Sequence, residues 1–252
     1  MRMCMRFLTF TTVLALTTAC DDSVTAPTAV DEGTLRADVA LVVADGMFQD
    51  LAHMDGFQTW TGFGVGPEAA GIEIQGSKNF SKTVEYFDSN DKPQSAYHPE
   101  ETAWMRVTSS LEREVNHTFW SAAITRNREM VVTGMLNTET ERTWNGTSDG
   151  TVDRSRHPDG GSEKTYDMES SAVITDVVRG VPRSQHKYPL SGSITRTVHA
   201  VITTDGVEEV RDFVSTITFD GDNTATMTVD GESWEINLDD KGVKKRFSKG
   251  NG

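Results

Sequence analysis

Apolar and polar residues alternate along much of the second half of the chain. Between Leu190 and Ile202 every even position is apolar except Gly192 and Arg196, and the odd positions up to His199 carry serine, threonine or histidine. A period of two places alternate side chains on opposite faces of a β-strand, so this stretch predicts a long, half-buried strand. Shorter runs with the same period cover residues 213–219, 225–229 and 234–238.

Asp-Gly pairs separate these runs. They occur at Asp205-Gly206, Asp220-Gly221 and Asp230-Gly231. Asp-Gly readily adopts the positive φ angles that a tight hairpin turn needs. Because such turns join antiparallel neighbours, the second half of the chain predicts an antiparallel meander.

The first half continues this pattern less regularly. Further strands are predicted over residues 79–87, 118–125, 129–136, 138–155 and 164–178. Residues 104–115 fit a helix as well as a strand, because Trp104, Val107, Leu111 and Val115 follow helical spacing. Their serine and threonine content and their neighbours favour a strand.

One helix is predicted before the strands. Its apolar residues recur at every fourth position: Leu35, Val39, Val43, Met47 and Leu51. This spacing predicts an amphipathic helix over residues 34–54. The glycine-containing stretch over residues 56–76 is predicted to be a loop. It does not link a strand to a helix, as a nucleotide-binding glycine loop would.

The fold class that follows is all-β, in a single domain over residues 34–252 with one N-terminal amphipathic helix. Long strands need curvature and protected edges. We therefore expect the antiparallel meander to form a strongly curved sheet, a sandwich or an incomplete barrel.

The first residues have the order of a bacterial export signal. Arg2 and Arg6 precede a short stretch of apolar residues and threonines, residues 7–16. This stretch is shorter than the roughly 20 residues that a membrane-spanning helix needs. We expect residues 1–19 to be a signal peptide that is cleaved after Ala19.

The sequence around Cys20 resembles the lipobox of bacterial lipoproteins, in which the cysteine receives a diacylglyceryl group. It departs from the family pattern at Thr17, where leucine is preferred, and Leu16 stands one position too early. Cleavage after Ala19 by an ordinary signal peptidase is the alternative. Cys4 leaves with the signal peptide, so Cys20 would be the only thiol of an exported chain, and acylation accounts for it.

Residues 20–33 are polar and contain Pro27, a composition that predicts a flexible, lipid-anchored tether. The lipobox, the single helix, the threonine-rich strands and a Trp-Asn-Gly hairpin at residues 144–146 together resemble uncharacterised bacterial lipoproteins. The resemblance implies an exported protein held in the cell envelope, with the membrane as partner through the lipid. Asp21 does not decide between inner and outer membrane, because the retention rule for this position varies among bacteria.

Composition narrows the range of partners. The chain has 38 acidic residues against 24 lysines and arginines, a net charge of −14. The charge becomes about −16 when the signal peptide removes Arg2 and Arg6 and no acidic residue. This acidity argues against nucleic-acid binding and against electrostatic adsorption to anionic lipid.

Motifs for catalysis or metal binding are not recognisable, so no catalytic residue, metal or cofactor is predicted. The six histidines show no His-x-x-x-His or His-Glu-x-x-His spacing, and no Gly-x-Ser-x-Gly elbow occurs. Arg196 is the one anomaly, a charged residue on the apolar face of its strand. Either its guanidinium reaches water near a sheet edge, or it contacts an anionic ligand within a cup.

The expected function is that of a non-enzymatic, lipid-anchored envelope protein that binds or scaffolds an envelope protein, lipid or glycan. Two alternatives remain open. In the first, the curved sheet carries an apolar ligand in a cavity lined by residues such as Trp104, Trp120, Phe213 and Trp234. In the second, the protein hydrolyses envelope polymers with two carboxylates about 5 to 10 Å apart in an exposed cleft.

Overall fold

The computed structural model describes residues 32–54, 78–116, 120–137, 139–156, 163–239 and 243–245. The predicted signal peptide, Cys20, the loop over residues 56–76 and all but the last two residues of the tether lie outside these ranges. Helix α1, Glu32–Met54, matches the predicted helix and begins two residues before it.

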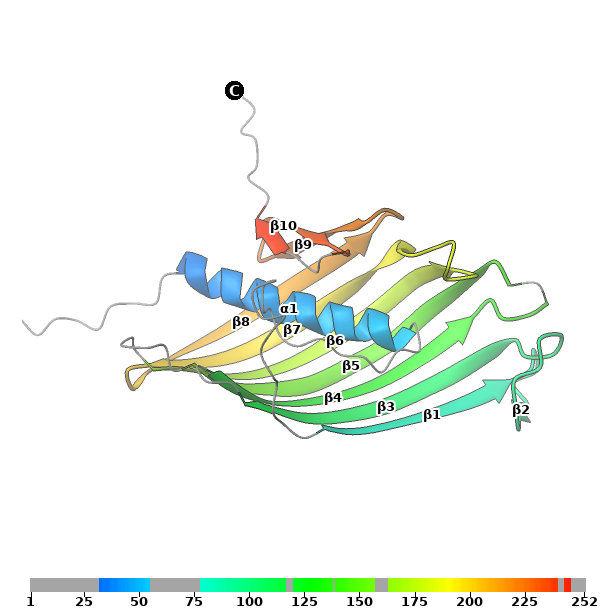
Figure 1. Cartoon of the computed structure of the whole chain (residues 1–252), viewed down its shortest axis with the longest axis horizontal. Helices are drawn as coiled ribbons and strands as arrows, with labels where there is room; N and C mark the ends of the chain where they lie inside the picture. Colours follow the sequence, from blue (N-terminus) through cyan, green and yellow to red (C-terminus); the bar gives the residue numbers. More distant parts are fainter. Residues whose placement is uncertain are drawn as a thin grey trace, which may run out of the picture.

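Within these described ranges, eleven strands form one sheet. They are β1 (Lys78–Phe87), β2 (Pro93–Gln94), β3 (Trp104–Asn116), β4 (Trp120–Thr133), β5 (Glu141–Arg156), β6 (Lys164–Gly180), β7 (Pro189–Thr204), β8 (Val207–Phe219), β9 (Thr224–Val229), β10 (Glu232–Asn237) and β11 (Val243–Lys245). From β3 to β11 each strand pairs with the next along the chain, and β2 folds back onto the far side of β1 (Figure 1). All pairings are antiparallel, which confirms the predicted meander.

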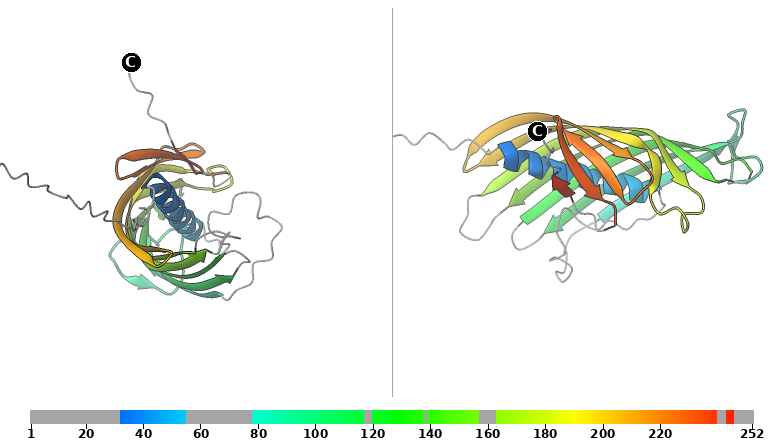
Figure 2. Two further views of the ribbon diagram at one scale, coloured as in Figure 1. Left: turned by 90° about the vertical axis from the view of Figure 1, so that its left-hand side faces the viewer. Right: turned by 90° about the horizontal axis from the view of Figure 1, so that it is seen from above.

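The sheet curls around α1 without closing. Figure 2 shows the strands as an open arc with the helix in its hollow. The strand order begins at β11 and ends at β2, and no pairing joins these two ends within the described residues. Of the predicted forms, the structure therefore has the strongly curved, open sheet. The helix takes the place of the second layer that a sheet needs to bury its apolar face.

The hydrophobic core lies between α1 and the concave face of the sheet. Inward side chains such as Ile194 and Val198 of β7 are at most 1% exposed. On α1 none of the described side chains from residue 42 to residue 54 is exposed. Val43, Met47 and even the charged Asp50 are 0% exposed. Because the sheet wraps the helix, burial extends beyond the single apolar stripe that the sequence predicts.

The predicted Asp-Gly turns connect neighbouring strands of the meander. Asp205 and Gly206 have φ angles of 50° and 80°, and Asp230 and Gly231 have φ angles of 45° and 85°. Both residues of each pair thus adopt the left-handed conformation that tight hairpins need. At the third turn, Gly221 has a φ of 97°.

Two details of the strand predictions are wrong, and one open choice is decided. Residues 118–125 and 129–136 are not separate strands, because β4 runs unbroken through residues 126–128. The Trp-Asn-Gly stretch at residues 144–146 is not a hairpin turn and lies inside the 16-residue strand β5. Residues 104–115 belong to strand β3, as favoured.

Asn145 and Gly146 contribute to a β-bulge instead of a turn. The register shifts next to Gly146 between β5 and β6, and shifts again between β6 and β7. Asp176 of β6 has a φ of 47° at this point. The Asn145 amide donates to Asp176 Oδ1 at 3.0 Å, and Asn145 Oδ1 accepts from the Asp176 N–H at 2.9 Å. Bulges bend a strand and increase its twist, so Asn145 supports the curl of the sheet.

Gly192 of β7 faces this bulge and has no room for a side chain. Its φ is +102°, and a Cβ would lie 2.3 Å from the Asp176 carbonyl oxygen. Gly206 has a φ of +80° but nothing within 4 Å of its Cβ position. We expect Gly192→Ala to lower the free energy of unfolding by about 3 kcal/mol or more, and Gly206→Ala by about 1 kcal/mol. Chemical denaturation measures both, and equal losses would contradict a steric role for Gly192.

Candidate functional site

A row of polar and small side chains crosses the middle of the concave face. It consists of directly paired residues on the successive strands β3 to β8: Ser109, Arg128, Ser148, Ala172, Arg196 and Ser215. All of them are buried. This polar row lies within an apolar surface, since buried side chains such as Ile124 and Met130 of β4 lie on either side of it.

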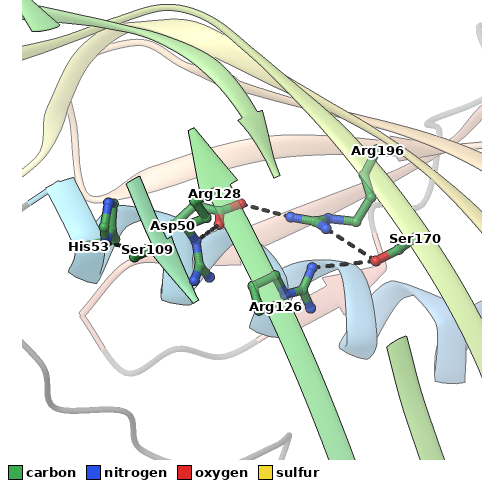
Figure 3. A network of polar contacts seen from close by, with 7 residues as sticks. All are labelled: Asp50, His53, Ser109, Arg126, Arg128, Ser170 and Arg196. Atoms are coloured by element: carbon green, nitrogen blue, oxygen red, sulfur yellow. Dashed lines mark hydrogen bonds and ion pairs between the residues drawn. The ribbon is translucent and has the colours of Figure 1, made fainter. Parts of the chain in front are cut away.

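Asp50 of α1 lies over the polar row and pairs with both of its arginines (Figure 3). Arg128 Nε donates to Asp50 Oδ1, and Arg196 Nη2 donates to Asp50 Oδ2, each at 2.7 Å. Gly46, one helical turn earlier, lets the helix backbone approach Arg196. A Cβ on Gly46 would lie 3.0 Å from the guanidinium carbon. Strands β4 and β7 thus direct two cations onto one carboxylate of the helix.

Arg126 adds a third guanidinium to this group. It is an inward residue of β4, two positions before Arg128, and is 2% exposed. Arg126 Nη1 and Arg196 Nη1 both donate to Ser170 Oγ, at 3.3 and 3.4 Å. We refer to Asp50, Arg126, Arg128 and Arg196 as the charge cluster. It holds three guanidinium groups and one carboxylate away from water.

Burial and mutual attraction set the protonation of the charge cluster. Burial alone would raise the pKa of the Asp50 carboxyl, but Arg128, Arg196 and Arg126 outweigh burial and hold it below its usual value. Asp50 is therefore ionised at neutral pH. Burial and the neighbouring Arg196 lower the pKa of Arg126 to about 9, so Arg126 is still mostly protonated at pH 7. The cluster accordingly carries more positive than negative charge.

His53 lies one turn after Asp50 on α1 and borders the charge cluster. Its Nδ1 lies 3.5 Å from Ser109 Oγ in the polar row, and the residue is 5% exposed. Burial, with repulsion from Arg128 and Lys82, lowers the pKa of the imidazole to about 4. The ring is therefore neutral near pH 7.

A cavity of about 310 Å³ opens at the C-terminal end of α1. Most of its wall is apolar or aromatic and comprises Met54, Val84, Tyr86, Tyr97, Met105, Val107, Met135 and Trp144. These residues belong to α1, β1, β3 and β5 and to the segments that follow β2 and β4. Cavities of this size and character accept small ligands.

Two cations, Lys82 and Arg142, complete the wall of the cavity, and no Asp or Glu among the residues that the structure describes lines it. Lys82 belongs to strand β1 at the edge region and pairs in register with Ser109 of the polar row. Arg142 is oriented by Glu139, to which its Nε donates at 2.5 Å. The Tyr97 hydroxyl donates to the other carboxylate oxygen of Glu139. The cavity therefore joins an apolar wall to positively charged donors.

The structure places Arg196 in the centre of the core. It lies on the interior strand β7 and is 1% exposed, so the alternative in which its guanidinium reaches water at a sheet edge is wrong. The anion that Arg196 contacts is the carboxylate of Asp50. Cys20 and Ala19 lie outside the described residues.

Three of the aromatic residues that the sequence suggests for a cavity, Trp104, Phe213 and Trp234, do not line this one. Phe213 and Trp234 pack in the core and are 4% and 6% exposed. Trp104 stacks on Phe87 with ring centroids 3.9 Å apart, and its Nε1 donates to Asp91 Oδ1 at 3.0 Å. The side chain of Trp120 lies outside the described residues. The cavity lies instead where α1 ends.

Asp50, Arg126 and Arg128 are not predicted from the sequence, although a signal for them exists. In β4 the two arginines occupy inward positions between Ile124 and Met130, an anomaly of the same kind as Arg196 in β7. Dividing this range into two strands concealed it. Asp50 likewise interrupts the buried side of α1.

Comparisons with known proteins add no relative: no family model matches the chain, and neither the curated proteins nor the solved structures contain a significant match. Within the part of the chain that the structure describes, no helix combines the length and apolar character needed to span a membrane. The same residues contain no group of three or more His, Cys, Asp or Glu side chains suited to hold a metal ion.

The neutral state of His53 makes the stability of the fold depend on pH. The pKa of its imidazole falls from 6.5 to about 4 on folding, so the unfolded chain binds the proton first as the pH decreases. The stability that His53 contributes is complete above about pH 6.5 and is lost between about pH 6.5 and 4, up to about 3 kcal/mol. We expect His53→Asn to remove this loss.

Urea denaturation at intervals from pH 7 to pH 4 measures the effect. The matched control is His199→Asn, since His199 is exposed and its Nδ1 lies 2.7 Å from Asp212 Oδ1. This variant is expected to retain the decrease in stability toward acid pH. Identical pH profiles for the wild type and His53→Asn would contradict the assignment.

Proposed function

We propose that this chain is a lipid-anchored protein of the bacterial cell envelope that binds a small amphiphilic ligand and does not act on it chemically. The observation that carries the proposal is the cavity of about 310 Å³ at the end of α1, with its apolar wall and its two cations. The anchor rests on the signal-like residues 1–19 and on Cys20, which is the only cysteine outside that segment.

The wall of the cavity defines the class of ligand. Met54, Met105 and Trp144 offer apolar contact, which favours burial of a hydrocarbon or aromatic body. Lys82 and Arg142 offer N–H donors with positive charge, which favour a carboxylate, phosphate or sulfate group. A ligand that joins both parts, such as a short fatty acid, fits this wall best.

The two alternative functions, a carrier of an apolar ligand in the curved sheet and a hydrolase of envelope polymers, receive less support. A ligand that fills the whole cup would compete with α1, whose buried side chains occupy the hollow of the sheet. A hydrolase with two carboxylates requires both of them beside one cleft, whereas the described part of this cavity wall carries Lys82 and Arg142 and no acidic residue.

Filling the cavity is expected to weaken binding without loss of the fold. Val84 is partly buried on β1 and lines the cavity, so Val84→Trp places an indole where the ligand lies. We expect octanoate to bind the wild type, 1-octanol to bind at least tenfold more weakly and octylammonium not to bind. Val84→Trp is expected to weaken octanoate binding at least tenfold. Isothermal titration calorimetry on the full chain measures all four cases.

The control for this substitution is Val214→Trp, because Val214 lies on the outer face of β8 and is 52% exposed. It is expected to bind octanoate as the wild type does. Both variants are expected to retain the thermal midpoint within a few degrees. The proposal fails if the wild type binds none of the three compounds, or if Val84→Trp binds octanoate unchanged.

The lipid anchor has its own test. Expressed in bacteria, the wild-type chain is expected to begin at Cys20 with a diacylglyceryl group and to sediment with membranes. Cys20→Ser is expected to leave the membrane fraction, because a serine hydroxyl cannot form the thioether. Mass spectrometry of the mature N-terminus decides the matter, since an unmodified residue 20 would show that the chain has no lipid anchor.

A further inference from the structure

The charge cluster contains more positive than negative charge, and no contact among the described residues compensates for the difference. Three guanidinium groups share one carboxylate, and both oxygens of Asp50 are taken by Arg128 and Arg196. Arg126 is left with Ser170, a neutral hydroxyl. Buried charges are ordinarily paired, because removal of an unpaired ion from water costs several kcal/mol.

No other charge balances Arg126 within the part of the chain that the structure describes. The described groups that act on it are Arg196 and Arg128, which repel it, and Asp50 and Asp149, which attract it. Asp149 is an exposed residue of β5, whereas its neighbour Ser148 points into the core. Its attraction therefore acts across the sheet and partly through solvent. The excess positive charge remains on the concave side.

Several donors of the same groups are also unpartnered. Arg126 Nε, Arg128 Nη2 and Arg196 Nε are buried and have no hydrogen-bond partner among the atoms of the described residues. Guanidinium nitrogens are donors only, so each of them needs an acceptor. Unpartnered donors on two strands, together with the excess charge, call for an acceptor that carries negative charge.

We propose that the charge cluster binds one small inorganic monoanion, of the size of a halide, between Arg126 and Arg196 beside Ser170. Ser170 Oγ lies within 3.4 Å of a guanidinium nitrogen of each arginine, so it marks the point where the two groups converge. Gly46 packs against the Nε and Nη2 side of the Arg196 guanidinium, so the ion is placed on the Nη1 side, next to Ser170. The ion acts as a structural cofactor that stabilises the docking of α1 on the sheet.

Thermal unfolding of the full chain at pH 7 tests the proposal when sodium gluconate is replaced by sodium chloride at constant ionic strength. Gluconate is too large for the site, whereas chloride is not. We expect the midpoint of the wild type to rise with chloride and then to saturate, by about 5 °C or more at 100 times the Kd. Equal midpoints in the two salts would overturn the proposal.

Two variants locate the effect. Arg126→Met removes the guanidinium that lacks a carboxylate, and it is expected to abolish the difference between chloride and gluconate. Arg106→Met is the control, because Arg106 is 40% exposed on β3 and pairs with Glu85 and Glu129. It is expected to keep the full rise. A rise of the same size in Arg126→Met would overturn the site.

A direct measurement avoids dependence on the folding of any variant. Crystals of the wild-type chain grown in sodium bromide are expected to show an anomalous peak within hydrogen-bonding distance of Arg126 and Arg196. Bromide replaces chloride because it scatters anomalously at accessible wavelengths and has nearly the same radius. Absence of a peak at this position would overturn the proposal.

Discussion

The double ion pair of Asp50 with Arg128 and Arg196 fixes how the helix and the sheet fit together. The two arginines belong to β4 and β7, with β5 and β6 between them, yet both reach one carboxylate at 2.7 Å. This convergence requires a curled sheet and small residues between the arginines, which are Ser148 and Ala172. A buried ion pair adds little stability compared with apolar residues of the same size, but a misplaced partner is costly. We infer that the pair selects one rotation and one depth of α1 in the hollow.

The position of the helix in turn determines where a ligand has room. Met54 is the last residue of α1 and also part of the cavity wall, so the cavity lies where the helix no longer fills the hollow. Lys82 connects the two regions, since it lines the cavity and its charge also acts on His53. The charge cluster and the cavity are therefore neighbouring parts of one concave face. A shift of α1 along the hollow would change the size of the cavity.

The helix and the strands were easier to predict from the sequence than the contacts between them. Apolar residues repeat at every second position in strands such as β7 and at every fourth position in α1, so both kinds of element were predictable. Arg196 stood out for the same reason, but its partner Asp50 lies far away in sequence, and only the curl of the sheet brings them together. The prediction of a hairpin turn at Asn145-Gly146 was wrong because hairpin turns and bulges favour the same residue types. The cavity includes Tyr97 and Met135 from segments without periodicity, whose packing is a tertiary property.

The net charge of the chain describes its exterior and not its interior. The chain carries −14 overall, whereas its cavity is lined by two cations and its core contains three clustered arginines with one aspartate. Exposed charges are screened over about 8 Å at physiological salt, so the acidic surface repels an approaching anion only at short range. An anionic ligand is then selected by short-range contact, and most of its affinity has to come from apolar burial at about 25 cal/mol per Å². A ligand with an anionic group and an apolar body provides both the short-range contact and the apolar burial. A small polar anion in the open cavity would provide the contact without the burial.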